Sequence, residues 1–72
     1  MILVRYYIED VLFDKREISG FNRNKIIKEC QQMANDYPEE YKAVFNRISV
    51  GGSLSSIILI NVISNTKVIY SF

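Results

Sequence analysis

A run of seven residues near the C-terminus, six of them apolar, constrains the fold of this chain more than any other feature. The run is Ile57-Ile58-Leu59-Ile60-Asn61-Val62-Ile63, and only Asn61 is polar. Successive side chains of a β-strand point to opposite faces of the sheet, so a strand here is apolar on both sides. An antiparallel sheet with one face in water alternates apolar and polar residues instead. The run therefore predicts a strand that needs cover on both faces.

Turn signals on both sides of this run predict a three-stranded antiparallel meander. Gly51-Gly52 fits a two-residue hairpin, because adjacent glycines accept the positive φ of a type I′ turn. Residues 64–67 give a weaker turn signal. Residues 38–46 fit either a helix or a strand, and we expect a helical turn at 38–42 followed by a strand. If both loops have two residues, position 46 faces 57 and position 61 faces 70. The predicted strands are 43–50, 54–63 and 67–72.

This register divides the meander into a core face and a second face. The core face carries Val44, Ile48, Val50, Ile57, Leu59, Ile63, Val68, Tyr70 and Phe72. The second face mixes polar side chains with Phe45, Leu54, Ile58, Ile60, Val62 and Ile69. Burying an isoleucine is worth about 1.5–3 kcal/mol, and large exposed apolar patches mark interaction sites. Either segments 11–18 and 38–42 cover the second face, or another chain does.

The N-terminal half predicts one strand and the main helix. Residues 1–8 alternate and are rich in β-branched and aromatic side chains, which is typical of a strand. Residues 11–18 fit either a second strand or a helical turn, because Asp14 and Glu17 have capping-box spacing. A helix then begins after Asn22 as N-cap and ends before Pro38. Phe21 and Ile26 fit a hydrophobic staple at its start. Its apolar stripe is Ile26, Ile27, Cys30, Met33, Ala34 and Tyr37.

These elements predict a single α+β domain over residues 1–72. An antiparallel sheet, made of the N-terminal strand and the C-terminal meander, packs against one main amphipathic helix. A chain of 72 residues buries a small share of its surface and is often stabilised by a disulfide, a metal or a partner subunit. Cys30 is the only cysteine and there is no histidine, the commonest metal ligand. We therefore expect a homodimer, with no metal and no cofactor.

The composition favours binding over catalysis. Cys30 lies in the apolar stripe and has no histidine to act as its base, so we interpret it as a buried structural residue. The carboxylates stand at turns and helix starts, where solvated caps are common. Arg5 and Glu9-Asp10 interrupt the N-terminal apolar stretch, so neither a signal peptide nor a membrane span is expected. We expect a cytoplasmic protein that is not an enzyme.

Basic residues give an alternative function, nucleic-acid binding. Arg23, Lys25 and Lys28 lie near the start of the helix, where cations oppose the helix dipole. A phosphate contact would explain this placement, as would an ordinary solvated face. Arg5 and Tyr7, on the outer side of the first strand, fit a stacking platform for RNA bases. The nearly balanced charge, 9 basic against 8 acidic residues, argues against a binder that relies on net charge.

Residues 4–17, Val-Arg-Tyr-Tyr-Ile-Glu-Asp-Val-Leu-Phe-Asp-Lys-Arg-Glu, resemble the N-terminus of many small phage and prophage proteins of low-GC bacteria. The bias toward Ile, Asn, Lys and Tyr agrees. Proteins of that type are often accessory factors, including inhibitors of host defence enzymes such as anti-CRISPR proteins. The resemblance covers about a fifth of the chain and implies no particular site residue. It implies a partner in the host.

The leading prediction is a non-enzymatic protein-binding module, a homodimer, that occludes a surface of a protein partner. It depends on the apolar second face of the sheet. The predicted contact residues are Phe45, Ile58, Ile60, Val62 and Ile69, with Arg47 and Lys67 at the rim.

Overall fold

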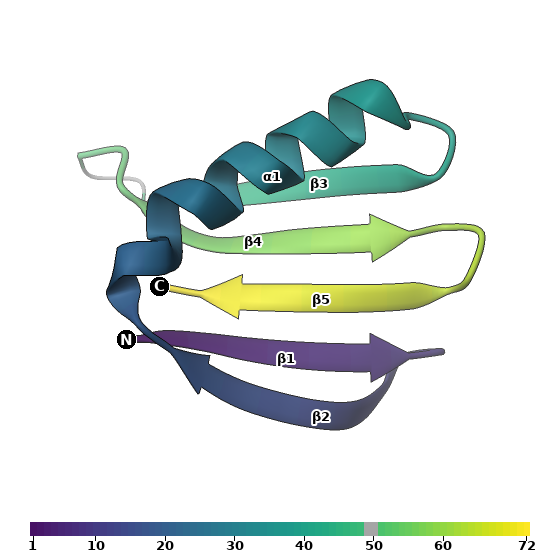
Figure 1. Cartoon of the computed structure of the whole chain (residues 1–72), viewed down its shortest axis with the longest axis horizontal. Coiled ribbons are helices and arrows are strands. Elements are labelled where there is room, and N and C mark those ends of the chain that lie inside the picture. The colour runs from purple at the N-terminus through teal and green to yellow at the C-terminus, as the bar shows by residue number, and fades with distance from the viewer. Residues whose placement is uncertain (49–50) are drawn as a thin grey trace.

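A computed structural model describes residues 1–48 and 51–72 of the chain. Its strands form one antiparallel sheet in the order β2-β1-β5-β4-β3, and one helix lies on a single face of it (Figure 1). The elements are β1 (Ile2–Ile8), β2 (Val11–Ile18), the 3-10 turn η1 (Gly20–Asn22), α1 (Arg23–Asp36), β3 (Tyr41–Arg47), β4 (Leu54–Asn61) and β5 (Thr66–Ser71). The predicted α+β class, antiparallel sheet and main helix are confirmed.

The N-terminal part of the sheet has two strands where the sequence predicted one. Residues 11–18, which fitted either a strand or a helical turn, form β2 and pair with β1. The chain reverses at Glu9 and Asp10, whose φ angles of 49° and 66° are both positive, as a tight hairpin turn requires. Two strands therefore extend the C-terminal meander, and β5 lies between β1 and β4.

The core lies between α1 and the sheet. Ile26 and Cys30 of α1 are buried against the strands, and Ile57 of β4 is 0% exposed. The other buried residues are Ile2, Val4, Leu54 and Leu59. The predicted stripe thus supplies the helix side of the core. Its last member, Tyr37, lies beyond the helix end and is 58% exposed.

The C-terminal end of α1 agrees with the sequence prediction, whereas the capping predicted at its N-terminal end does not. The helix stops at Asp36, before Pro38, as expected. Asn22 occupies the N-cap position but makes no side-chain capping bond. Ser19 begins η1 instead, and its Oγ accepts a hydrogen bond from the Phe21 N–H at 3.3 Å. Phe21 is 100% exposed, so the predicted hydrophobic staple is wrong.

The first hairpin of the meander has a register that differs by one residue from the prediction. Ile57 pairs with Phe45, not with Asn46, and the register shifts again between Asn46 and Arg47. A one-residue slip moves every side chain of the strand to the other face. Phe45 therefore packs on the core and Val44 does not.

The loop of this hairpin and the register shift between Asn46 and Arg47 together explain the slip. The loop alone moves the pairing by two positions, and the shift at Arg47 makes the net change one residue. The Ile48 N–H donates to the Ser53 carbonyl at 2.8 Å, so these two residues pair across the hairpin. The connection is thus longer than the predicted two-residue turn. Gly51 and Gly52 have the expected positive φ angles, 86° and 70°. The predicted strand end at Ser49 and Val50 lies outside the described residues.

The second hairpin also differs from the prediction, but without moving side chains between faces. Asn61 pairs with Thr66, and residues 62–65 form the turn. The Asn61 Oδ1 accepts hydrogen bonds from the N–H groups of Ile63 and Ser64, both at 3.0 Å. The shift from the predicted partner is four positions, an even number, so Tyr70 still faces the helix. Ile63, predicted in the core, is 73% exposed in the turn.

Candidate interaction surface

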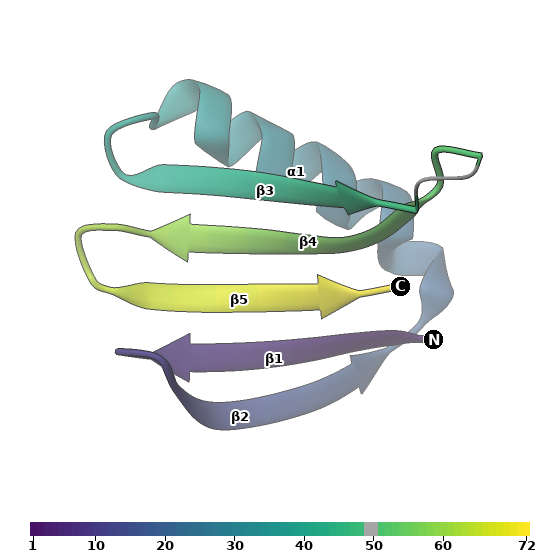
Figure 2. The same ribbon diagram turned by 180° about the vertical axis from the view of Figure 1, so that it is seen from behind.

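The sheet face opposite α1, here called the open face, has no helix over it (Figure 2). Strand pairing orders its side chains into three rows that cross all five strands, because residues paired across an antiparallel ladder point to the same face. The rows are Glu17–Leu3–Ser71–Ser56–Asn46, Lys15–Arg5–Ile69–Ile58–Val44 and Leu12–Tyr7–Lys67–Ile60–Lys42.

Four side chains in the middle of the open face form an apolar centre: Val44, Ile58, Ile60 and Ile69. Ile58 is paired directly with Ile69 on one side and with Val44 on the other. Ile60 lies two residues from Ile58 on the same strand and therefore on the same face. The isoleucines are half-buried by one another, and Val44 is 44% exposed at the end of the row.

Four cations surround this centre and form a basic rim: Arg5, Lys15, Lys42 and Lys67. Arg5 pairs with Ile69, whereas Lys42 and Lys67 lie on either side of Ile60. Glu17 is the single acidic residue among the three rows of described residues. The whole chain is nearly neutral, with 9 basic and 8 acidic residues. The open face is thus more basic than the rest of the molecule.

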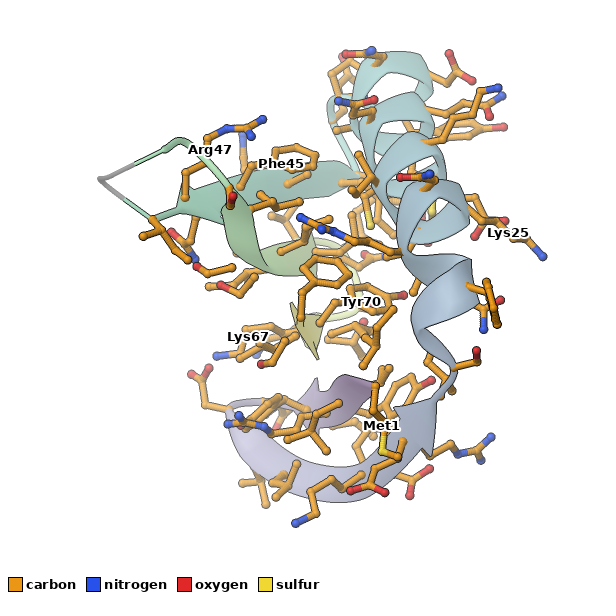
Figure 3. All side chains as sticks on the ribbon, turned by 90° about the vertical axis from the view of Figure 1, so that its left-hand side faces the viewer. Met1, Lys25, Phe45, Arg47, Lys67 and Tyr70 are labelled. Atoms are coloured by element: carbon orange, nitrogen blue, oxygen red, sulfur yellow. The ribbon has the colours of Figure 1, made fainter. Side chains whose placement is uncertain are left out.

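Lys67 and Arg5 are held in different ways. The Lys67 Nζ is 3.2 Å from the Asp10 Oδ1 and 4.9 Å from the centre of the Tyr7 ring. Figure 3 shows Lys67 pointing away from α1, on the opposite side of the sheet from Tyr70. The Arg5 Nε is buried and has no hydrogen-bond partner in the described part of the chain. A buried donor without an acceptor is unfavourable, so this placement of Arg5 has a cost in stability.

The predicted contact residues do not all lie on one face. Ile58, Ile60, Ile69 and Lys67 lie together on the open face. Phe45 lies on the helix side because of the register slip, which is a correction to its predicted face. The two remaining residues lie outside the rows, at strand ends: Arg47 donates to the Gly52 carbonyl at 3.2 Å, and Val62 is in the second turn.

Sequence reasoning missed three residues of this surface: Lys15, in the ambiguous segment 11–18, and Val44 and Lys42. Val44 was predicted in the core, and Lys42 was predicted in a helical turn. Both lie in β3 and face away from the helix. The alternation of Tyr41, Ala43 and Phe45 with Lys42, Val44 and Asn46 was the available signal, since it separates a more apolar side from a more polar one.

The predicted nucleic-acid residues do not form one surface. Arg5 and Tyr7 lie on the open face, whereas the other three residues belong to α1, on the opposite side of the sheet. The Arg23 Nη2 donates to the Leu54 carbonyl at 3.2 Å, and its guanidinium lies 5.3 Å from the Phe72 ring centre. Arg23 therefore ties α1 to β4 and to the C-terminus. Lys25 and Lys28 are exposed, and Lys25 points away from the sheet in Figure 3.

Cys30 is poorly suited to nucleophilic chemistry. Its side chain is 2% exposed, and burial, with a smaller contribution from the charge of Glu29, raises the thiol pKa to about 11. Very little reactive thiolate is present at neutral pH. Burial also raises the pKa of Tyr70 to about 12, with Cys30, Tyr6 and Glu29 adding to it. Both groups are therefore neutral members of the core.

Carboxylates gather elsewhere, near the end of α1. An open hollow of about 350 Å³ is lined there by Asp36, Tyr37, Pro38, Glu39, Glu40 and Ile63. No group of three or more His, Cys, Asp or Glu residues within 1–48 and 51–72 is arranged to hold a metal ion.

No helix in the described residues has the length and apolar character to cross a membrane. Comparisons with protein-family models, with curated protein sequences and with solved structures returned no match.

Proposed function

We propose that this chain is a non-enzymatic binding module whose open face occupies a complementary, acidic surface of a protein partner. The observation that carries the proposal is the apolar centre inside a basic rim on the sheet face that α1 leaves uncovered. The support comes in three parts: the apolar side chains, the charges and the lack of an activated nucleophile.

The apolar centre supplies the binding energy. Strand β4 carries Ile57 and Leu59 toward the helix, and Ile58 and Ile60 toward the open face. Each isoleucine that becomes fully buried contributes up to about 1.5–3 kcal/mol, and the half-buried ones retain part of that gain for a partner. Interfaces commonly have such an apolar centre with a polar rim.

The basic rim indicates the charge of the partner. Four cations against Glu17 attract a surface that carries carboxylates around an apolar projection. Arg5, which pairs with Ile69 in the middle row, places one of these cations directly beside the apolar centre. Two open faces packed on each other would bring cation against cation, which is unfavourable. The occupant of this face is therefore a different protein.

The buried Cys30 and the absence of histidine from the sequence support binding over catalysis. The resemblance of residues 4–17 to small phage and prophage proteins makes a host protein, including a defence enzyme, the partner class to examine first. Surface occlusion needs no catalytic group, so it is compatible with everything the open face carries.

Affinity capture with matched variants tests the proposal. Ile60→Glu places a carboxylate in the apolar centre between Lys42 and Lys67, where the two cations help the variant to fold. Val62→Glu is the control, since Val62 is 46% exposed in the turn, outside the three rows. We expect proteins captured by the wild type to be retained by Val62→Glu and lost by Ile60→Glu.

Binding assays with the purified candidate proteins then test whether the basic rim contributes to affinity. A true partner binds with an affinity that falls when Arg5→Gln or Lys42→Gln is introduced and when salt is raised. If every captured protein binds Ile60→Glu and the wild type equally well, the open face is not the binding surface and the proposal is wrong.

A second candidate is single-stranded nucleic acid on the same face, favoured by the juxtaposition of Arg5, Tyr7 and Lys67. A sheet with cations and an aromatic ring can bind the backbone and stack a base. This candidate predicts a gel shift with RNA or DNA at low salt that weakens steeply as salt rises, and that Tyr7→Ala reduces. Absence of any shift at low salt removes it.

A further inference from the structure

One corner on the helix side of the sheet stays exposed, at the hairpin end of β1 and β2. Residues paired across an antiparallel ladder share a face, so strand pairing gives two rows there. The rows are Asp14–Tyr6–Val68–Leu59–Ala43 and Val11–Ile8–Thr66–Asn61–Tyr41. The helix packs mainly on β3 and β4, and in Figure 1 it crosses the sheet diagonally, away from this end of β1 and β2. Within the described part of the chain, no helix covers the β1 and β2 ends of the two rows.

The uncovered corner is apolar. Phe13 has no partner in the β1–β2 ladder, because the register shifts there, and its ring centre lies 6.1 Å from that of Tyr6. Val11 and Phe13 are 67% and 59% exposed, and Ile8 is exposed beside them. Val68, which pairs with Tyr6, is half-buried. These five residues, Tyr6, Ile8, Val11, Phe13 and Val68, form what we call the corner patch. Exposed apolar patches of this kind mark interaction sites.

The side of α1 toward the corner patch carries carboxylates. Glu29, Met33 and Asp36 lie on one side of the helix, because residues three and four apart are neighbours on its surface. Burial is the main cause of the raised pKa of Tyr70, and the charge of Glu29 adds to it. Tyr70 belongs to β5, so this side of α1 faces β5 and the strands beyond it.

Two adjoining hollows follow the same side of α1. The first, of about 230 Å³, is lined by Glu29, Gln32, Met33, Asp36 and Tyr37. It shares Asp36 and Tyr37 with the hollow at the helix end, which reaches Ile63 in the turn between β4 and β5. The space beside α1 is therefore open from the middle of the helix down to the sheet.

The charges around this space favour a cationic occupant. Arg16 of β2 is already paired, since its Nε lies 3.0 Å from the Asp14 Oδ2. The Glu29 Oε1 has only the Lys25 Nζ at 4.0 Å, an exposed pair of a kind that contributes little, and Lys25 points away from the sheet in Figure 3. Asp36 makes no ion pair within residues 1–48 and 51–72. Both carboxylates of the helix are therefore available to a cation.

The shape of the corner fits a helix. Strands β5 and β1 each have a neighbour on both sides, so their backbone groups are used within the sheet. An occupant above them has to satisfy its own backbone groups, and a helix does so internally. Neighbouring strands lie about 4.8 Å apart, so β5, β1 and β2 together span roughly 10 Å, about the diameter of a helix. On the same side of the sheet, α1 already packs on β3 and β4 in this way.

We propose that the corner patch and the acidic side of α1 together bind a basic amphipathic helix of a protein partner. The apolar face of that helix lies on the corner patch, and its lysine or arginine side chains face Glu29 and Asp36. These carboxylates are two helical turns apart, roughly 10 Å, which matches cations two turns apart on the incoming helix. Docking of an amphipathic helix into an apolar groove is a common mode of recognition.

This inference goes beyond the proposed function because it concerns the other side of the sheet and a partner of opposite charge. The open face has a basic rim and attracts an acidic surface, whereas the corner has an acidic wall and attracts a basic one. The two surfaces are therefore separable by the charge of a probe.

Two synthetic peptides as long as α1 test the proposal in NMR titrations of the isotope-labelled protein. One carries leucine on one face and lysine on the other, and the second carries glutamate in place of every lysine. We expect the lysine peptide to shift the amide signals of the corner patch and of residues 29–36, and the glutamate peptide to leave them unchanged. No binding of the lysine peptide at about 1 mM, or shifts confined to the rest of the chain, overturns the proposal.

Glu29→Lys tests the acidic wall, with Glu17→Lys as the matched control. Both residues are exposed and both variants change the net charge equally, but Glu17 lies on the open face. We expect Glu29→Lys to weaken binding of the lysine peptide about fivefold and Glu17→Lys to leave it unchanged. Equal weakening would mean that net charge alone attracts the peptide, and the proposal is then wrong.

Phe13→Ser tests the apolar floor, with Phe21→Ser as the matched control. Phe21 is fully exposed in η1, which follows the opposite end of β2 from the hairpin. We expect Phe13→Ser to weaken binding of the lysine peptide about tenfold and Phe21→Ser to leave it unchanged. The spectra of the unbound variants verify that both are folded. If both substitutions weaken binding equally, the peptide adheres to any exposed ring and the corner is not its site.

A second copy of this chain is the competing occupant of the corner, and sedimentation distinguishes it. A wild-type dimer that Phe13→Ser converts to a monomer would mean that a second copy fills the corner, and the proposal is wrong. A monomeric wild type whose corner patch responds to the lysine peptide supports it.

Ile60→Glu separates this inference from the proposed function, because Ile60 lies on the open face. Loss of partner capture together with unchanged binding of the lysine peptide supports both proposals. Unchanged capture together with unchanged peptide binding removes the proposed function and leaves the corner intact.

Discussion

The two faces of the sheet are made from the same strands, with similar residues, but only one of them is covered. Ile57 and Ile58 are neighbours in β4. Ile57 is 0% exposed beneath α1, whereas Ile58 is half-buried beside Ile69 and Val44 on the open face. The helix face is closed by Ile26 and the neutral thiol of Cys30, and the open face is bounded by cations. The difference teaches that one 14-residue helix closes the core on one face of the sheet and leaves the other face open.

The largest loss of stability is expected when Ile57, on the covered face, is replaced. Ile57→Ala leaves a cavity in the core and should lower the free energy of unfolding by about 2–5 kcal/mol, whereas Ile58→Ala should lower it by about 1 kcal/mol. Urea titration at low protein concentration measures both midpoints, with unchanged slopes if only stability is affected. Equal losses for the two variants would mean that the open face is as well packed as the core.

The next prediction concerns the register of β3. Phe45→Ala removes a ring that packs against the core and should cost about 2–3 kcal/mol, less than a fully buried phenylalanine. Val44→Ala, one residue away and on the open face, should cost about 0.5 kcal/mol. The same titration compares them. A larger loss for Val44→Ala would restore the register predicted from the sequence.

A smaller effect is expected where α1 meets the end of β4. Arg23→Ala removes the hydrogen bond to the Leu54 carbonyl and the contact with the Phe72 ring, and should cost about 1–2 kcal/mol. Lys25→Ala is the control, because its ion pair with Glu29 is long and exposed and contributes less than about 0.5 kcal/mol. Similar losses in thermal unfolding would show that Arg23 is an ordinary surface cation.

A loss of stability is also expected at alkaline pH. The pKa of Cys30 rises from 9.0 to about 11, and that of Tyr70 from 10.0 to about 12, chiefly because both are buried. The unfolded chain releases these protons at a lower pH than the folded chain does. The free energy of unfolding is therefore unaffected by them below pH 9 and falls between pH 9 and pH 12.

Cys30→Ala is the control for this pH dependence. It removes the thiol, so the fall should begin near pH 10, the ordinary pKa of the remaining Tyr70. Chemical denaturation at a series of pH values measures the onset in both proteins. A stability that stays constant from pH 9 to pH 12 would show that neither group is buried in solution.

Local signals in the sequence identified some elements of this fold and left others undecided. The proline after α1 limits its end, the stripe from Ile26 to Met33 defines its buried side, and alternation identifies β1. Residues 11–18 stayed ambiguous because Asp14-Lys15-Arg16-Glu17 fits a helix cap as well as a charged edge strand. Pairing with β1, which is not visible in the local pattern, resolves the ambiguity.

The candidate surface was predicted in part. Ile58, Ile60, Ile69 and Lys67 were placed on one face from alternation alone, because β4 and β5 keep their predicted faces. Their neighbours on β3, Val44 and Lys42, were not predicted on this face. The loop length and the register shift near Arg47 together change the pairing by one residue. A shift of one moves side chains between faces, and a shift of four does not.

The sequence by itself determined that β4 is apolar on both sides, and therefore that one helix is insufficient to cover it. Only the tertiary structure decided what surrounds its outer side. The hairpin register brought Val44 and Lys42 next to Ile58 and Ile60, and the addition of β1 brought Arg5 next to Ile69. The physical reason is that side-chain direction is a local property of a strand, whereas the neighbours of a side chain depend on pairing between distant segments.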